Sequence, residues 1–280
     1  MIAALARAAA AAAALLAGLG TAHAKPRAVS LDYCADQYLL KLADPAQILA
    51  VSREADKDYA YMRAAAAAHR RIRATPEEAL TLKPDLVLRQ WGGGPNANRA
   101  FGRFGAEVVA VGHPTDFDGV RANIRLVAGA LDQPARGEAL IAEMDRRLAA
   151  LRARKGERPR ALYVTPGGVT AGAGTMIDAV FQAAGVDNAA ALAGQSYWPP
   201  LPAEALLLAP PEMIVAGFFD SDAESVNYWS AARHPALEAL FRKTRSVHLP
   251  PDLIGCAAWY SVEAAERIAD GVSREESDGF

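Results

Sequence analysis

Aromatic side chains in the connecting segments are the residues of this chain whose types and positions best suit a binding site. Each falls at or just after a predicted strand, or just before a predicted helix. Aromatic walls bury a large, flat, partly apolar ligand at a small cost in side-chain entropy, although any single one is equally consistent with ordinary packing. The aromatic residues that we assign to ligand contacts are Tyr33, Tyr61, Trp91, Trp198, Phe218, Trp229 and Trp259.

Arginine side chains near the same loops offer positive charge. Arg53 follows a predicted strand, and its guanidinium is suited to carboxylate or catecholate oxygens of a ligand. We therefore assign Arg53 to the ligand site. The simpler alternative for Arg53, as for Arg63 and Arg89, is a solvated surface side chain.

Motifs for catalysis and metal binding are missing from the sequence. It contains no G-x-S-x-G, no H-E-x-x-H and no P-loop. The Gly-rich segment from Pro166 to Gly174 lacks the Lys and the spacing of a nucleotide site, and it suits a tight turn instead. The histidines do not pair at metal-ligand spacing, and His113 is the one that we single out, because it ends a predicted strand. We predict no catalytic residue, no resident metal and no cofactor.

Two carboxylates, Glu77 and Glu204, occupy the same place in two similar segments of the chain. Aligning them also aligns Pro84 with Pro211. Each segment is predicted to form a short helix, a Pro-acid turn and a buried strand. A carboxylate near a helix N-terminus complements the helix dipole, and a pair on two lobes could also present two anionic groups to a protein partner.

Cys34 and Cys256 are the two cysteines of the chain. In an oxidising compartment they can form a disulfide. Spacing alone does not decide connectivity, and two buried free thiols fit the sequence equally well.

A long amphipathic helix divides the chain into two halves. From Pro134 to about Lys155, apolar residues recur at helical spacing among charged ones. In each half, predicted strands alternate with helices, which favours parallel α/β layers. We predict an α/β fold with two lobes of mostly parallel sheet flanked by helices and joined by one long interdomain helix. The predicted boundaries are 25–133 for the N-terminal lobe, 134–156 for the connecting helix, 157–270 for the C-terminal lobe and 271–280 for a flexible tail.

Two segments within the lobes have a clear local preference. The Ala-rich stretch Met62–Arg70 is expected to be helical. Met213–Phe219 is expected to form one strand, because it is a continuous apolar run.

The first 24 residues have a composition of their own. Arg7 is the only charged residue there, and an Ala-rich apolar run follows that is too short to span a bilayer. The run ends in Ala22-His-Ala24, which is typical of a signal peptide cleaved near Ala24. The mature chain is therefore expected outside the cytoplasm, and a net charge of −2 argues against a nucleic-acid partner.

Four segments carry a resemblance to a known family: Ser30-Leu-Asp-Tyr-Cys-Ala-Asp-Gln37, the Pro-Glu-Glu-x-Leu-x-Leu-Lys-Pro-Asp-Leu-Val unit, the Gly-Ala-Gly-Thr loop before Met176, and the Glu204 unit. With them the chain, from about Ala28 to Asp270, resembles the periplasmic substrate-binding proteins of ABC importers for iron-siderophores and cobalamin. The resemblance implies two α/β lobes joined by a long helix, with the ligand in the cleft between them. Such proteins move little on binding, because a helix is a stiff link.

The resemblance also implies roles for particular residues. One Glu on each lobe of these proteins contacts the permease, and Glu77 and Glu204 match those positions. In the cobalamin-binding member a Trp before the second unit touches the ligand, and Trp198 matches it. A second Trp of that member aligns with Gln90, with Trp91 one step on, so the chain departs from the cobalamin pattern there.

We therefore expect a periplasmic, monomeric solute-binding protein that captures a metal chelate and hands it to an inner-membrane ABC permease without covalent chemistry. A ferric siderophore is the preferred ligand, ahead of cobalamin or another corrinoid, or heme. The resemblance places Cys34 and Cys256 at the rim of the cleft on opposite lobes, where a disulfide would tie the lobes together. The competing class is a secreted α/β enzyme that uses the Gly-rich loop.

Overall fold

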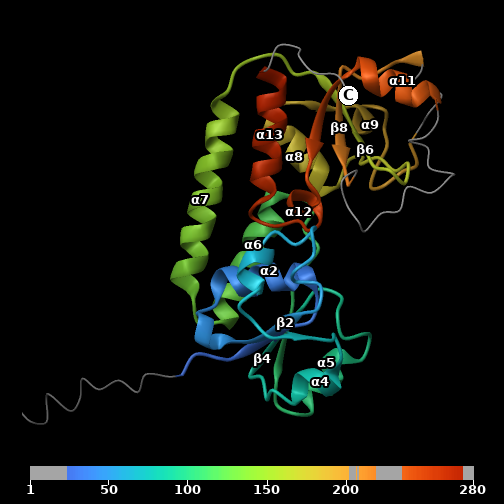
Figure 1. The fold of residues 1–280 in the computed structure, drawn as a ribbon. Helices are drawn as coiled ribbons and strands as arrows, with labels where there is room; N and C mark the ends of the chain where they lie inside the picture. Colours follow the sequence, from blue (N-terminus) through green and yellow to red (C-terminus); the bar gives the residue numbers. More distant parts are fainter. Residues whose placement is uncertain (1–23, 202–205, 207, 219–234, 274–280) are drawn as a thin grey trace, which may run out of the picture.

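Two parallel sheets lie at opposite ends of the molecule, and a long helix runs along one side of it (Figure 1). The computed structural model describes residues 24–201, 206, 208–218 and 235–273. The predictions for the signal peptide, Glu204 and Trp229 fall outside these residues. No helix in the described part of the chain is long and apolar enough to cross a membrane. The predicted fold class, two α/β lobes, is confirmed.

The N-terminal lobe, called the N-lobe below, holds a five-stranded sheet in the order β3-β2-β1-β4-β5, with each neighbouring pair parallel. Its strands are short and apolar because helices cover the sheet. They are β1 (Ala28–Ser30), β2 (Ile48–Ser52), β3 (Arg71–Ile72), β4 (Leu86–Arg89) and β5 (Glu107–Ala110).

The helices of the N-lobe begin where the sequence offers caps. Asp32, Thr75 and Asp116 each accept a hydrogen bond from a backbone N–H of the helix that follows, which satisfies donors that a helix start leaves free. The helices are α2 (Tyr33–Leu42), α3 (Arg63–Ala66), α4 (Pro76–Leu80), α5 (Ala97–Gly102) and α6 (Phe117–Ala130), with a short 3-10 turn at Pro45–Gln47.

The helix predicted over Met62–Arg70 is wrong in its extent. Only Arg63–Ala66 is α-helical. The chain then turns and pairs Arg71 with Val51, so that β3 extends the sheet. Sheet pairing therefore overrides the helical preference of the Ala-rich stretch.

The C-terminal lobe, or C-lobe, holds a four-stranded parallel sheet in the order β7-β6-β8-β9. The strands are β6 (Arg160–Val164), β7 (Asp187–Asn188), β8 (Met213–Gly217) and β9 (Arg245–Leu249). The described helices are α8 (Met176–Ala184), α9 (Ala189–Leu192), α11 (Pro235–Lys243), α12 (Pro251–Ile254) and α13 (Ser261–Ser273). The short elements β7, α9 and α12 were not predicted.

Two predicted ends in the C-lobe are corrected. The strand β8 stops at Gly217 because Phe218 takes a left-handed backbone, with φ of 64°. The helix α13 continues to Ser273, so the flexible tail does not begin at Gly271. Gly271 lies so close to β9 that an added Cβ would come within 2.3 Å of Val247 Cγ2, and this packing extends the helix.

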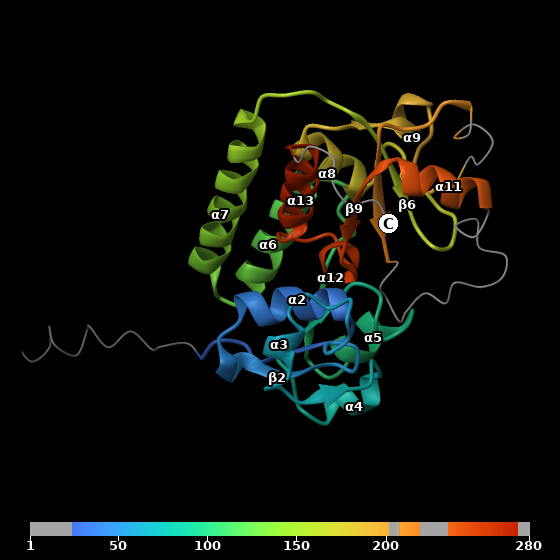
Figure 2. The same ribbon diagram turned by 45° about the horizontal axis from the view of Figure 1, so that its top comes forward.

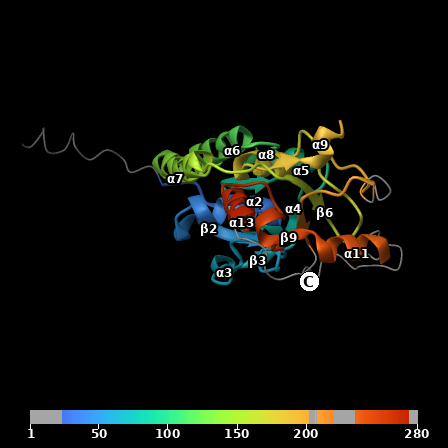
Figure 3. The same cartoon turned by 90° about the horizontal axis from the view of Figure 1, so that it is seen from above.

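The connecting helix α7 (Pro134–Ala153) buries Leu140, Met144, Leu148 and Leu151, as the sequence predicts. It ends before residue 156, because Arg154 takes an extended backbone. Figures 2 and 3 show α7 on the side of the molecule away from α11.

Ion pairs attach α7 to a helix of each lobe. Arg121 of α6 pairs with Asp145 at 2.5 Å, and Arg147 of α7 pairs with Glu266 of α13 at 2.6 Å. The connecting helix is thus bound to both lobes through two residues that lie within one turn of each other.

Candidate ligand-binding site

A cleft of about 300 Å³ opens between the two lobes, a volume within the range of small-molecule sites. On the N-lobe it is lined by the start of α2 and by the segments that follow β4 and β5. On the C-lobe it is lined by the start of α8, by residues 197–198 and by the connection from α12 to α13. The N-lobe segments lie beyond the carboxyl ends of parallel strands, where α/β folds place their ligands.

The N-lobe wall of the cleft carries three aromatic rings, those of Tyr33, Trp91 and His113. The rings of Tyr33 and Trp91 meet edge to face with centroids 5.1 Å apart, and the Trp91 and His113 rings lie 6.2 Å apart. Tyr59 supports Tyr33 from behind, with ring centroids 4.7 Å apart. Trp91 remains 42% exposed, so this wall is held by ring packing and still presents an indole to a ligand.

The C-lobe wall presents Tyr197 and Trp198, which are 69% and 54% exposed. The Gly-rich segment holds them in place: Gly172 N–H donates to Tyr197 O at 2.8 Å, and Tyr197 N–H donates to Ala173 O at 2.9 Å. An added Cβ on Gly172 would lie 2.4 Å from Gln195 O, so only glycine permits this approach. The Gly-rich loop therefore serves to carry two aromatic residues.

The described residues that line the cleft include no Asp, Glu, Lys or Arg. Polar groups come from side chains that are neutral or can be neutral, among them Gln90, His113, Thr115 and Thr175. Burial, with smaller contributions from Glu54 and Asp32, raises the pKa of Tyr33, so its phenol stays protonated at neutral pH. The cleft thus offers flat apolar faces and a few neutral hydrogen-bonding groups.

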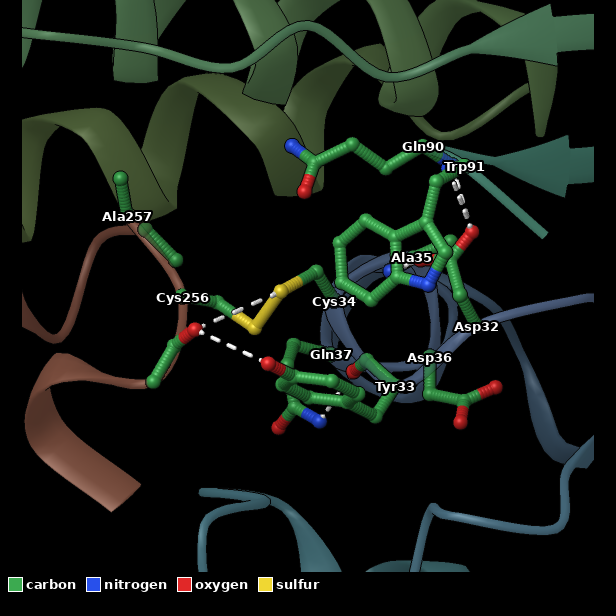
Figure 4. The surroundings of a disulfide bond; sticks show 12 residues. Asp32, Tyr33, Cys34, Ala35, Asp36, Gln37, Gln90, Trp91, Cys256 and Ala257 are labelled. Carbon is green, nitrogen blue, oxygen red and sulfur yellow. Dashed lines mark hydrogen bonds between the residues drawn. A yellow bond between two sulfur atoms is a disulfide. The ribbon is translucent and has the colours of Figure 1, made fainter. Parts of the chain in front are cut away.

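A disulfide joins Cys34 at the start of α2 to Cys256 beyond α12, with Cα atoms 5.6 Å apart (Figure 4). Both cysteines line the cleft. The Tyr33 hydroxyl donates to Gly255 O at 3.4 Å across the same junction. Of the two alternatives that the sequence leaves open, the structure therefore has the disulfide, which ties the lobes together beside the cleft.

Two residues assigned to the ligand lie instead in the contact between the lobes, and these assignments are corrected. Trp259 is 5% exposed and packs edge to face on Tyr38 of the N-lobe, with centroids 5.5 Å apart. Tyr61 stacks on Tyr260 at 4.1 Å, and its hydroxyl donates to Glu263 at 2.6 Å. Neither residue lines the cleft. Large rings at the lobe boundary are buried by the opposite lobe, which removes them from a ligand.

Two further residues that we assigned to the ligand, Arg53 and Phe218, are not among the described residues that line the cleft. Arg53 is exposed in the turn after β2, and half-buried Phe218 follows β8 in a left-handed conformation that redirects the chain. Neither residue lines the cleft. Trp229 lies outside the described residues.

The expected docking carboxylates can be compared only in part. Glu77 is exposed in the first turn of α4. Its neighbour Glu78 is used locally, because it accepts a hydrogen bond from Arg73 N–H at 3.0 Å. Glu204 lies outside the described residues.

The sequence did not reveal the structural roles of two residues at the cleft, Tyr197 and Asp32. Tyr197 lines the cleft next to Trp198. Its position beside Trp198 in the sequence was the feature from which this role could have been predicted. Asp32 caps α2 and also accepts hydrogen bonds from Gln90, Trp91 and Gly92. No sequence pattern pointed to these long-range contacts.

Comparisons with known proteins agree with this geometry. A family model described as periplasmic binding protein matches residues 29–224. No curated protein matches the chain.

Solved structures of similar fold include the periplasmic heme-binding protein RhuT from Roseiflexus sp. RS-1 in apo form, with 26% identity and a TM-score of 0.69, covering 88% of this chain and 99% of that chain. The periplasmic heme-binding protein HutB of Vibrio cholerae has 19% identity and a TM-score of 0.69, covering 89% and 99%. The periplasmic vitamin B12-binding protein BtuF of Vibrio cholerae has 19% identity and a TM-score of 0.63, covering 89% and 97%. The last two comparisons show the fold alone.

Proposed function

The chain belongs to the periplasmic binding protein family, and from that premise we propose that it captures a metal chelate in the interlobe cleft and delivers it to an inner-membrane ABC permease. The proposal includes export to the periplasm with cleavage near Ala24. The family and the similar structures are binding proteins, which favours capture over catalysis. The cleft supports the same conclusion, because it offers rings and neutral hydrogen-bonding groups.

The ligand that suits this cleft best is a flat metal macrocycle of the tetrapyrrole class, with heme first and a corrinoid second. The observation that carries this choice is the lining: Trp91 and Trp198 face the cleft from opposite lobes, and the described lining has no charged acid or base. Aromatic rings stack on the faces of a macrocycle. An anionic ferric catecholate carries its charge around the iron and would lose hydration against the described lining without a paired cation there, which is costly, whereas the two carboxylates of heme lie at one edge and can stay in solvent. This reverses the order of preference that the sequence favoured.

The cleft also contains groups able to bind an iron atom. Heme iron accepts an axial His or Tyr, and His113, Tyr33 and Tyr197 line the cleft. His113 is exposed beside the Trp91 ring, where a macrocycle stacked on that ring would approach it. His113 is therefore our first candidate for an axial ligand.

A neutral ferric hydroxamate is the third candidate, after heme and a corrinoid. Its complex can be uncharged, and a described lining without Asp, Glu, Lys or Arg does not exclude it. An ABC-type Fe3+-hydroxamate transport system protein from Saccharomonospora viridis DSM 43017 shares the fold, with 21% identity and a TM-score of 0.62.

Titration of the purified mature protein with hemin, hydroxocobalamin, a ferric hydroxamate and a ferric catecholate distinguishes these ligands. We expect hemin to quench Trp fluorescence at one equivalent, with a Soret band that His113→Ala shifts. No ligand should be chemically changed on prolonged incubation. Tighter binding of the catecholate than of hemin would overturn the ligand assignment, and turnover of any ligand would overturn capture without chemistry.

The permease contact is tested separately from ligand binding. Replacing Glu77 and Glu204 with Ala should abolish ligand uptake by cells and leave the affinity for hemin unchanged, because Glu77 is exposed on α4 and outside the cleft lining. Replacing Glu78, which is engaged with Arg73, is the matched control and should leave uptake in place. A large loss of hemin affinity in the double variant would contradict the docking role.

A further inference from the structure

The buried carboxylate of Asp32 lies where the N-lobe wall of the cleft begins. Asp32 is 1% exposed and precedes α2 directly. Its Oδ1 accepts a hydrogen bond from Ala35 N–H at 2.9 Å, which caps the helix. A cap of this kind requires only one oxygen, so the second oxygen is available for another task.

The second oxygen, Oδ2, holds the segment that follows β4. It accepts hydrogen bonds from three consecutive backbone N–H groups, those of Gln90 at 2.6 Å, Trp91 at 3.1 Å and Gly92 at 3.0 Å (Figure 4 shows Asp32 below Trp91). Successive N–H groups that converge in this way form an anion-binding concavity. Here the anion is part of the protein itself.

The same segment is pressed against the end of β1. An added Cβ on Gly92 would lie 2.2 Å from Leu31 O, so the backbone passes where only glycine fits. With its N–H groups directed at Asp32 and its Cα against Leu31, this segment is fixed on two sides. The indole of Trp91 therefore extends into the cleft from a backbone segment that is held in place.

The contacts extend from Asp32 to the whole N-lobe wall. Tyr33, the next residue, packs edge to face on Trp91. The Gln90 side chain donates to Gly112 O at 2.5 Å, and Gly112 directly precedes His113. One carboxylate thus connects the three aromatic rings of this wall.

We propose that Asp32 is a positioning residue that sets the N-lobe wall of the cleft, Tyr33, Trp91 and His113, for the ligand. The proposal rests on the proposed function for its effect on binding, and on the structure alone for its effect on Trp91. Asp32 does not line the cleft and acts through the N–H groups of residues 90–92.

Asp36 provides a matched control in the same helix. It is fully buried, and its carboxyl group accepts hydrogen bonds from Ser30 and from Ser52 N–H and Oγ. These partners belong to the ends of β1 and β2, and none of them is among residues 90–92. Asp36→Asn therefore tests the general cost of removing a buried carboxyl group from α2, and Asp32→Asn tests the wall.

The first measurement uses protein without ligand. Asp32→Asn replaces one carboxylate oxygen with an NH2 group and removes the negative charge, so either Ala35 N–H or the three converging N–H groups lose their acceptor, and the carbonyl oxygen that remains is a weaker acceptor. We expect acrylamide to quench the fluorescence of Trp91 more strongly in Asp32→Asn. The contribution of Trp91 to the quenching is obtained by subtracting the quenching measured when Trp91→Phe is present. Asp36→Asn should leave that part unchanged.

The second measurement uses hemin as the probe. Because hydrogen bonds to a charged group are among the stronger ones, Asp32→Asn should weaken hemin binding by roughly tenfold or more. In a Trp91→Ala background the same change should have an effect of less than about threefold, because the residue being positioned is gone. Asp32→Glu should not restore the affinity, since its longer side chain displaces the second oxygen.

The outcomes separate this proposal from the proposed function. Increased Trp91 accessibility in Asp32→Asn with no hemin binding by the wild type supports positioning and overturns the heme assignment. Unchanged Trp91 accessibility overturns positioning, whatever the ligand. Two further outcomes would also overturn the proposal, because each would make Asp32 a purely structural residue. One is an equal loss of hemin affinity in Asp32→Asn and Asp36→Asn, and the other is an equal effect of Asp32→Asn in the presence and absence of Trp91.

Discussion

Two sides of the same lobe boundary are built from aromatic residues, yet they serve different ends. On the closed side, Tyr38, Tyr61, Trp259 and Tyr260 pack across the boundary and are buried or half-buried. On the open side, Trp91, Tyr197 and Trp198 remain exposed. The closed side has partners from both lobes, whereas the open side faces the cleft.

The difference between the two sides lies in the contacts that hold the lobes together. The Tyr61–Glu263 hydrogen bond and the Arg63–Asp252 ion pair at 2.7 Å join the lobes on the closed side, and the disulfide joins them at the edge of the cleft. Once these contacts bring the lobes together, the rings between them lose their water. The rings beyond them stay available, and this separates packing aromatics from binding aromatics.

Trp259→Ala should have the largest effect on stability. Removing a buried Trp leaves a cavity and costs roughly 3–5 kcal/mol of unfolding free energy. Urea denaturation followed by circular dichroism measures this loss. Affinity for hemin, corrected for the folded fraction, should stay within a few fold; a large loss in fully folded protein would return Trp259 to the ligand site.

Replacing both cysteines by Ser should have the next largest effect. The disulfide closes a loop between residues 222 positions apart, and its loss should lower the unfolding free energy by roughly 2–5 kcal/mol. The wild type should show no free thiol when denatured without reductant. Two titratable thiols in that assay would show that the bridge is not formed in the isolated protein.

Trp198→Ala tests the open side. We expect hemin affinity to fall by about 2 kcal/mol, the loss of a buried aromatic anchor, while the urea midpoint stays close to that of the wild type because Trp198 is 54% exposed. Isothermal titration with hemin measures the affinity. A stability loss as large as that of Trp259→Ala would remove the distinction between the two sides.

Asp36 adds a smaller, pH-dependent effect on the α2 helix, which reaches the closed side. Burial raises the pKa of Asp36 from 3.8 to about 7. The folded state therefore keeps the proton between these two pH values while the unfolded chain releases it, and stability falls as pH rises from about 4 to about 7. Urea midpoints across this range should decline less in Asp36→Asn than in the wild type. Equal slopes in the two proteins would contradict the raised pKa.

The order of the elements and much of their extent could be predicted from local pattern. The apolar stripe of α7, the caps at Asp32 and Asp116, and the apolar strands β4 and β6 depend on neighbouring residues, so periodicity and capping rules reach them. The shortened helix at Arg63–Ala66 and the strand β3 could not be predicted in this way, because pairing with Val51 decides them.

The sequence predicted an aromatic ligand site, but it identified only some of the residues that line the cleft. Tyr33, Trp91 and Trp198 line the cleft as predicted, although their contact with a ligand remains a proposal. Tyr61 and Trp259 belong to the same residue class and follow the same kind of loop, and nothing local distinguishes them. Their burial depends on Tyr260 and Tyr38, which are far away in the sequence.

By itself, the sequence determined two α/β halves, a stiff helix between them and loops rich in aromatic rings, because these features follow from short-range periodicity and composition. Only the tertiary structure decided that Cys34 meets Cys256, that Asp32 gathers the N–H groups beside Trp91, and which rings the opposite lobe covers. Each of those depends on atoms that approach from distant parts of the chain, and the burial of a ring is a property of both partners.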